Sequence, residues 1–265
     1  MSSASEPDHA AEARPPHITI EGLTMAFGSR VLMERLTFTI RRGDIFIIMG
    51  GSGSGKSTLM RHLVGLQQPA AGRIQFCGLS MWEADSEQRA MLQRRIGIMY
   101  QQGALWTSMT LAENVALPLQ TYTRLTPEAI AELAEYKLSL VGLGGFGDYF
   151  PSEISGGMRK RAAIARAMAL DPEILFLDEP GAGLDPITSR LLDDLILELR
   201  KTLGMTIVIV THELASIFAV GDNSVFLDAE TRTMIASGNP SWLVEHTDQP
   251  KLRAFLTRGA AEPAA

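Results

Sequence analysis

The sequence predicts an α/β protein with a mainly parallel β-sheet, an antiparallel β-layer near its N-terminus and an inserted α-helical subdomain. Three observations predict this fold class. A glycine-rich loop lies between a short apolar strand and a helix. Strands alternate with helices through much of the chain, which is typical of a parallel sheet with right-handed crossovers. Residues 100–165 interrupt this alternation with a stretch that has helical patterns and little strand pattern.

The composition is that of an ordinary folded protein of 265 residues, with 46% hydrophobic and 20% charged residues. Its 24 basic and 30 acidic residues give a net charge of −6, so no global basic field is available to hold nucleic acid. The single cysteine, Cys77, excludes an intramolecular disulfide and is most simply a small apolar residue. No signal segment and no apolar run of the ~18 to 20 residues that cross a bilayer are visible. We therefore expect a cytoplasmic protein whose membrane role, if any, comes through a partner.

The N-terminal part predicts a tail followed by two strands. Residues 1–16 are rich in Ala, Glu, Ser and Pro and are expected to be disordered. Residues 17–25 and 36–40 alternate as strands do, on either side of a turn at residues 28–30. They predict the antiparallel layer.

The glycine-rich loop fits the pattern Gly-x-x-x-x-Gly-Lys-Ser/Thr, a phosphate-binding loop. It follows the apolar strand 44–49 and precedes a helix with Leu59, Leu63 and Leu66 at helical spacing. Its glycines let backbone N–H groups curve around an anion, and the following helix directs its positive end to the same place. Lys56 would reach the β- and γ-phosphates, and the Ser57 hydroxyl would ligate Mg²⁺. The phosphate-binding residues are Gly50, Gly51, Ser52, Gly53, Ser54, Gly55, Lys56, Ser57 and Thr58. By itself the loop leaves kinases, GTPases and motor proteins open.

The next elements lead into the helical insertion. Residues 72–78 and 96–100 are expected strands, with a helix at 86–95 between them. A short helix at 112–119 should be stopped by Pro118. Thr126, Pro127 and Glu128 start another helix, whose apolar stripe contains Ile130, Leu133, Leu138 and Val141. The last helix, 157–170, carries a basic cluster that we interpret as a solvated or nucleotide-adjacent face: Arg159, Lys160, Arg161 and Arg166.

The α/β alternation then resumes. We expect strands at 174–177, 206–210, 224–227 and 233–236, and helices at 187–203, 214–220, 241–245 and 251–256. The predicted division is a domain from 17 to 238, followed by a helical extension and tail from 239 to 265. No internal repeat is visible, so the chain supplies one nucleotide-binding unit.

Two carboxylates end the strand at 174–177, where parallel sheets place ligand-binding groups. Asp178 would hold the shell of Mg²⁺, and Glu179 would orient or deprotonate an attacking water. A strand end capped by solvated acids is the alternative interpretation.

A second glycine motif, Ile154-Ser155-Gly156-Gly157-Met158, precedes a helix. Together with the phosphate-binding loop, Gln101, Asp178-Glu179, Leu184-Asp185 and His212, in that order, it makes the chain resemble the ATPase subunits of ABC transporters. The resemblance covers about residues 17–238. It implies an ABC-type ATPase fold with a P-loop core, ATP and Mg²⁺ as cofactors, and a homodimer in which Ser155, Gly156 and Gly157 grip the γ-phosphate of ATP held by the second copy.

The resemblance also implies roles for single residues. Gln101 corresponds to a hinge glutamine that touches Mg²⁺ and water, although Gln102 leaves the register open by one residue. His212 corresponds to a switch histidine that supports Glu179 as a catalytic residue. Phe27 matches a ring that stacks on adenine, with core packing as its alternative, and Asp185 lies in a loop that crosses the dimer interface.

Position 158 departs from most of the family, which has glutamine where this chain has methionine; a thioether cannot donate an amide's hydrogen bond. Met158, residues 102–106 and the stretch 178–186 resemble the branch that serves bacterial MCE-type lipid transporters. That resemblance implies a peripheral protein on the cytoplasmic face of the inner membrane, partnered by an integral membrane permease, an MCE-domain protein and a small STAS-like subunit. Transport of another substrate and a soluble, non-transport ABC ATPase are the alternatives.

Four apolar residues follow Gln101 and are expected either to dock the permease or to form the core of the insertion. They are Leu105, Trp106, Met109 and Leu111.

Overall fold

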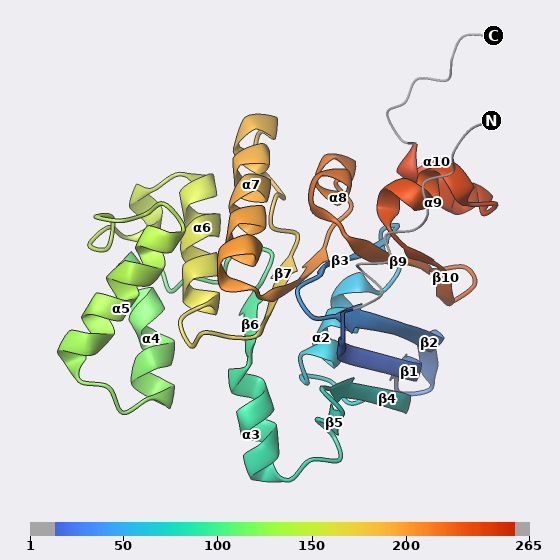
Figure 1. The fold of residues 1–265 in the computed structure, drawn as a ribbon, viewed down its shortest axis with the longest axis horizontal. Coiled ribbons are helices and arrows are strands. Elements are labelled where there is room, and N and C mark those ends of the chain that lie inside the picture. Colours follow the sequence, from blue (N-terminus) through green and yellow to red (C-terminus); the bar gives the residue numbers. More distant parts are fainter. Residues whose placement is uncertain (1–13, 258–265) are drawn as a thin grey trace.

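The structure is a computed structural model that describes residues 14–257, and the architecture has two sheets with helices around them (Figure 1). The smaller sheet is antiparallel, in the order β2 (Arg30–Arg41), β1 (Pro16–Phe27), β4 (Ala71–Phe76) and β5 (Leu79–Ser80). The larger sheet has the order β10 (Thr233–Gly238), β9 (Asn223–Asp228), β3 (Ile45–Gly50), β8 (Thr206–Val210), β7 (Ile174–Asp178) and β6 (Ile96–Met99). Its strands are parallel except β10, which pairs antiparallel with β9. The predicted α/β fold with an antiparallel layer is confirmed.

Three helices form one end of the molecule, opposite the antiparallel sheet (Figure 1). They are α4 (Leu111–Tyr122), α5 (Pro127–Leu140) and α6 (Gly156–Ala167), and a short 3₁₀ turn at Pro151–Glu153 leads into α6. The other helices in the described part of the chain are α2 (Lys56–Leu63), α3 (Ser86–Arg94), α7 (Pro186–Leu203), α8 (Leu214–Val220), α9 (Pro240–His246) and α10 (Pro250–Leu256).

The central strands are buried on both faces, which their unbroken apolar runs predict. Alternate residues enter two separate cores. Ile47 and Leu175 pack with the helices from α4 to α10, whereas Phe46 and Phe176 pack with α2 and the antiparallel sheet. The ring of Phe46 stacks on Phe38 of β2, with centroids 5.4 Å apart. The parallel sheet therefore packs between two apolar layers. This packing holds the positions of the loops at the carboxyl ends of its strands.

Pro118 does not end the first helix of the insertion, so that prediction is wrong: α4 continues to Tyr122. A proline inside a helix removes one backbone hydrogen bond. The loss is tolerated because Thr110 caps the helix in a capping box, and because Val115 and Leu119 are buried in the core.

Other predictions need smaller corrections. Leu66 lies beyond the end of α2 and is exposed, so it is not part of that helix's apolar face. Cys77 is exposed and accepts a hydrogen bond from the Arg42 guanidinium at 2.9 Å, so it is not a packed apolar residue. Most of the predicted N-terminal tail lies outside the described residues. Its last residue, Pro16, already belongs to β1.

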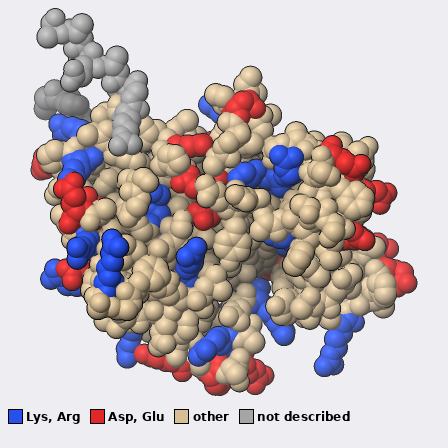
Figure 2. All heavy atoms as spheres, turned by 180° about the vertical axis from the view of Figure 1, so that it is seen from behind, with Lys and Arg blue, Asp and Glu red and all other residues tan. Residues whose placement is uncertain are grey.

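The surface seen from behind mixes basic and acidic side chains (Figure 2). Within residues 14–257, no helix combines the length and the apolar character that crossing a membrane requires.

Candidate functional site

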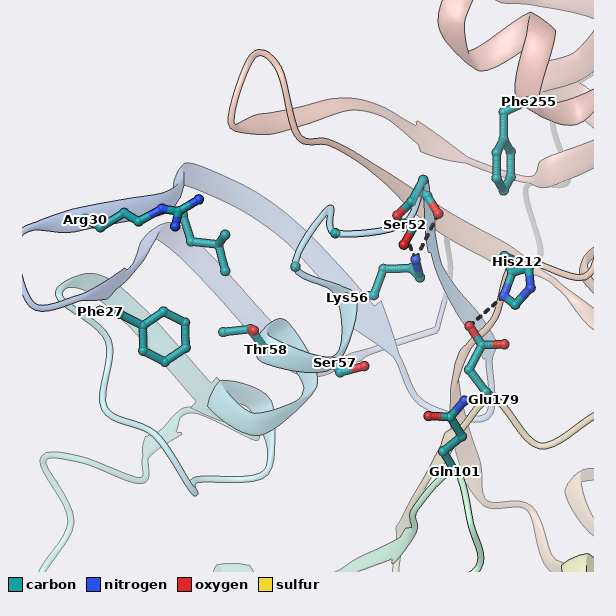
Figure 3. A pocket seen from close by; sticks show the side chains of 15 residues that line it. Phe27, Arg30, Ser52, Lys56, Ser57, Thr58, Gln101, Glu179, His212 and Phe255 are labelled. Atoms are coloured by element: carbon teal, nitrogen blue, oxygen red, sulfur yellow. Dashed lines mark hydrogen bonds and ion pairs between the residues drawn. The ribbon is translucent and has the colours of Figure 1, made fainter. Parts of the chain in front are cut away.

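A cavity of about 730 Å³ opens where the loops after β3, β6, β7 and β8 meet (Figure 3). These are carboxyl ends of parallel strands, the place where open α/β sheets bind ligands. The cavity is lined by Phe27, Arg30, Leu32, Gly50, Gly51, Ser52, Gly53, Gly55, Lys56, Ser57, Thr58, Gln101, Glu179, His212 and Phe255. The structure thus brings together most of the residues that the sequence singled out.

The floor of the cavity is the glycine-rich loop between β3 and α2. At Gly50, φ is +153°, and a Cβ there would lie 2.5 Å from the Leu227 carbonyl oxygen and 2.6 Å from Ser54 Oγ, so only glycine fits. Ser54 itself does not line the cavity. Its buried hydroxyl has no hydrogen-bond partner among the described residues.

The Lys56 side chain lies across the loop. Its Nζ donates to the carbonyl oxygens of Gly50 and Gly51, both at 2.9 Å, and burial lowers the pKa of Lys56. A partly buried ammonium held by neutral carbonyls is well placed to exchange them for phosphate oxygens, which carry charge. This geometry is that of an anion site.

Ser57 and Asp178 meet beside the lysine. Ser57 Oγ donates to Asp178 Oδ1 at 3.4 Å, and burial together with the neighbouring Glu179 raises the pKa of Asp178. A hydroxyl oxygen next to a carboxylate oxygen is a ligand pair that fits a small divalent cation such as Mg²⁺. Asp178 reaches the cavity through Ser57 and does not line it directly.

The Glu179 carboxylate is held by the histidine from the next strand. His212 Nδ1 lies 2.8 Å from Glu179 Oε1 (Figure 3). The other oxygen, Oε2, is buried and has no hydrogen-bond partner in the part of the chain that the structure describes. The backbone of Glu179 adopts φ of 48°, and its N–H donates to Val210 of β8 at 2.8 Å. A non-glycine residue in this region is strained, and such strain tends to occur at functional sites. The arrangement suits a general base that is oriented by a histidine.

Gln101, two residues beyond the end of β6, lines the cavity, whereas Gln102 does not. Of the two glutamines between which the sequence left the register open, Gln101 is the one that faces the cavity, and its role as the hinge glutamine stays a prediction.

Phe27 and Arg30 face one another across the β1–β2 turn and form the far side of the cavity from Glu179 (Figure 3). The Phe27 ring is 53% exposed, so it is not a core residue, and the core-packing alternative is excluded.

The second glycine motif lies away from this cavity. Ser155 caps α6, its Oγ accepting from the Met158 N–H at 3.2 Å, and Gly157 approaches α7 so closely that a Cβ would lie 2.5 Å from Thr188 Cγ2. Asp185 caps α7 and accepts from the Thr188 N–H and hydroxyl, which lowers the pKa of Asp185. None of Ser155, Gly156, Gly157 and Asp185 lines the cavity.

Sequence reasoning missed several residues of the site. The missed residues that line the cavity are Arg30, Leu32 and Phe255. No sequence motif marks them, so they are identified only from their place in the folded chain. Lys160 was expected on a solvated or nucleotide-adjacent face. The solvated interpretation is wrong, because its side chain is buried beside Gln101 and Glu179, and burial lowers its pKa.

The sequence profile of the ABC transporter family matches residues 33–182. The chain belongs to the ABC transporter family. It is an ATPase of this family, and the predicted family resemblance is confirmed.

Relatives of known name extend along almost the whole chain. It is 39% identical over 253 residues to the probable ribonucleotide transport ATP-binding protein mkl of Mycobacterium tuberculosis, covering 95% of this chain and 70% of the relative. It is 36% identical over 239 residues to the intermembrane phospholipid transport system ATP-binding protein MlaF of Escherichia coli K12, covering 90% of this chain and 88% of MlaF.

Solved ABC structures share the fold. The ATP-binding cassette MJ0796, in a dimeric post-hydrolysis state bound to ADP and Pi, superposes with a TM-score of 0.74 at 28% identity over 84% of this chain and 98% of that one. CbiO1 from Clostridium perfringens, part of the ABC transporter complex cbiONQ, gives a TM-score of 0.80 at 26% identity, over 92% of this chain and 96% of its own.

Proposed function

We propose that this protein is the ATP-hydrolysing subunit of a bacterial ABC transporter. Two copies close around two Mg-ATP and drive a separate membrane permease. The permease moves phospholipid or another lipid. The observation that carries the hydrolytic assignment is the Glu179–His212 pair beside the Lys56 loop, in which the buried Glu179 Oε2 has no hydrogen-bond partner among the described residues.

The catalytic roles follow from this geometry. Glu179 would accept the proton of the attacking water on its unpartnered oxygen, while His212, protonated on Nδ1, would donate to Oε1 and hold the carboxylate in place. Lys56 would exchange the two loop carbonyls for the β- and γ-phosphates. Phe27 would stack on adenine.

Ser57, Asp178 and Gln101 would hold Mg²⁺, directly or through water, and the meeting of the Ser57 hydroxyl with the Asp178 carboxylate at 3.4 Å is the structural observation that fits it. The ion supplies neutralising charge at the phosphate oxygens.

Two copies are proposed because each chain carries two parts of an ATP site that do not meet within that chain. The loop from Gly50 to Thr58 lies at one face, and Ser155, Gly156 and Gly157 lie outside that cavity at the N-terminus of α6. A helix N-terminus preceded by a serine is suited to bind the γ-phosphate of ATP that the second copy holds. Asp185 would then contact the opposite loop. The dimeric state of the MJ0796 cassette supports this arrangement.

The lipid cargo is supported by MlaF, whose name states intermembrane phospholipid transport and which this chain matches over nearly all of its length. We therefore place the protein on the cytoplasmic face of the inner membrane, with a permease, an MCE-domain protein and a small STAS-like subunit as partners. Trp106, which is exposed, and Met109 would contribute to the permease-docking surface, whereas Leu111 is fully buried and belongs to the core.

A ribonucleotide cargo is the second candidate, because the name of the mkl relative states ribonucleotide transport.

The test is to co-express the chain with the membrane proteins encoded beside its gene and to reconstitute the purified complex in proteoliposomes. We expect a multi-span protein to co-purify, and phospholipid to stimulate ATP hydrolysis and move between labelled and unlabelled membranes. Stimulation by ribonucleotides alone would favour the second candidate. Failure to co-purify with any membrane protein would contradict the transporter assignment.

A further inference from the structure

Lys160 is a buried cation that the catalytic roles above do not use. It lies one turn into α6, and only 9% of it is exposed. Its Nζ donates to the backbone carbonyl of Gln101 and, at 3.3 Å, to that of Glu179. A buried ammonium needs such partners, because an unpaired charge away from water is strongly destabilising.

The two carbonyls belong to separate loops of the site. Gln101 follows β6 and Glu179 follows β7, and both side chains line the cavity. Lys160 does not line it. One ammonium thus fixes the backbone of two residues whose side chains are proposed to face the attacking water and Mg²⁺.

The backbone of Glu179 is fixed from several sides. Its N–H donates to Val210 of β8, and its carbonyl accepts from Lys160 and from the Ala182 N–H at 3.2 Å. Because φ of Glu179 is 48°, the peptide needs surrounding contacts to stay in this conformation. Lys160 supplies the contact that comes from the helical subdomain.

The same helix begins at the second glycine motif. Ser155, Gly156 and Gly157 form its N-terminus, and Lys160 lies only one turn further along. Any displacement of α6 is therefore transmitted by a rigid helix to the two carbonyls that Lys160 binds.

We propose that Lys160 is a positioning residue that ties the N-terminal end of α6, proposed to engage ATP of the second copy, to Gln101 and Glu179 of its own chain. This inference rests on the proposed function, because it needs Glu179 to be the general base. Its consequence concerns the two ATP sites of the dimer, each built from the loop of one copy and the α6 N-terminus of the other. When ATP binds at one of these sites, the position of the Glu179 carboxylate at the other site should change.

The test compares Lys160→Met, a side chain of similar length without charge, with the wild-type protein. We expect kcat for ATP hydrolysis to fall at least about 10-fold, since misplacing a catalytic group by about 1 Å costs up to ~100-fold. KM should change less than about threefold, because Lys160 does not touch the cavity. Arg161→Met is the matched control. Arg161 lies on the same helix but donates to the carbonyls of Val141 and Gly142, which do not line the cavity, so this variant should keep kcat within about twofold of wild type.

A double-mutant cycle with Glu179→Gln separates positioning from general damage. If Lys160 acts through Glu179, adding Lys160→Met to Glu179→Gln should lower the residual single-turnover rate by less than about threefold. An equal loss in both backgrounds, a kcat within twofold of wild type, or a rise in KM alone would overturn the inference. Should Lys160→Met fail to fold in a thermal melt, Lys160→Leu, which also removes the donor, replaces it under the same criteria. Near-normal turnover by Glu179→Gln alone would instead contradict the proposed function, and the inference with it.

Discussion

At the scale of single residues, the two oxygens of the Glu179 carboxylate have opposite surroundings. Oε1 lies 2.8 Å from His212 Nδ1, and Oε2 is buried without a hydrogen-bond partner within residues 14–257. An unsatisfied buried oxygen costs about 1–3 kcal/mol. A water that binds there, as the proposed role of Glu179 requires, would remove this cost.

Glu179→Gln should bind ATP with nearly unchanged affinity and hydrolyse it at least ~100-fold more slowly, because an amide keeps the shape of the side chain but cannot accept the proton. Binding of a fluorescent ATP analogue and release of phosphate measure the two properties. Gln102→Ala, outside the cavity, serves as a control that should retain turnover. Turnover near that of the wild type would rule out Glu179 as the base.

His17 makes stability depend on pH. It is buried, its Nδ1 lies 2.7 Å from Thr206 Oγ1, and burial lowers its pKa from 6.5 to about 4. The unfolded chain therefore binds a proton on this group first, so its contribution is fully present at neutral pH and is lost as pH falls from about 6.5 towards 4. At pH 5 the loss should be about 2 kcal/mol.

Urea unfolding at pH 7.5 and pH 5 of the wild type and of His17→Gln tests this prediction. Glutamine does not titrate, so the difference in unfolding free energy between the two pH values should be smaller in the variant by about 2 kcal/mol. An identical pH dependence in both proteins would show that His17 is protonated equally in the folded and unfolded states.

Single residues also mark the limits of sequence reasoning. Lys56, Ser57, Glu179 and His212 were predicted because motif order fixes their places along the chain. Lys160 was missed because a lysine in an arginine-rich helix has the pattern of a solvated face, and only packing shows that its ammonium points inward.

At the scale of elements, β6 and α6 approach each other at a glycine. A Cβ at Gly97 would lie 2.3 Å from the Ala167 carbonyl oxygen and 2.9 Å from Pro172 Cγ. The first of these is backbone, which cannot rotate away. The close approach brings α6, and with it Lys160, against the strand that leads to Gln101.

Gly97→Ala should therefore destabilise the protein by about 1–3 kcal/mol in urea unfolding, as overpacking does. Gly144→Ala is the matched control, because its Cβ would meet the hydroxyl of Ser139, an exposed side chain that can turn. The control should change stability by less than about 0.5 kcal/mol. Equal effects of the two substitutions would mean that α6 can shift without cost.

Element prediction succeeded where strand and helix patterns were unambiguous. The bounds of β8 and α8 agree with the sequence prediction residue for residue. It failed at Pro118, because local propensity predicts a break that tertiary packing of α4 overrides. The predicted strand at 36–40 is also shorter than β2, because the first residues of β2 pair with β1 but show no clear alternating pattern.

At the scale of the whole molecule, the proposed composite sites predict complementation between two inactive variants. Lys56→Ala damages the loop half, and Ser155→Arg blocks the α6 half. In a mixed dimer one site carries both lesions and the other carries none. Random mixing should therefore restore about a quarter of wild-type activity, since half of the dimers are mixed and each has one intact site.

Phosphate release from each variant alone and from the mixture measures this. Each variant alone should be inactive. Activity of either variant by itself, or full recovery on mixing, would indicate that a single chain contains a complete site.

The cavity wall described above also bears on how this protein is compared with its relatives. The family profile covers residues 33–182, but Phe27, Arg30, Leu32, His212 and Phe255 all line the cavity from outside that range. The segment that the family profile matches is thus smaller than the set of residues that line the cavity. Phe255, on α10, lies against Phe226 of β9, with ring centroids 5.1 Å apart, and so α10, the last helix within residues 14–257, contributes a side chain to the cavity wall. Differences in nucleotide preference or rate among relatives should accordingly be sought in their first strands and C-terminal helices as well as in the shared motifs.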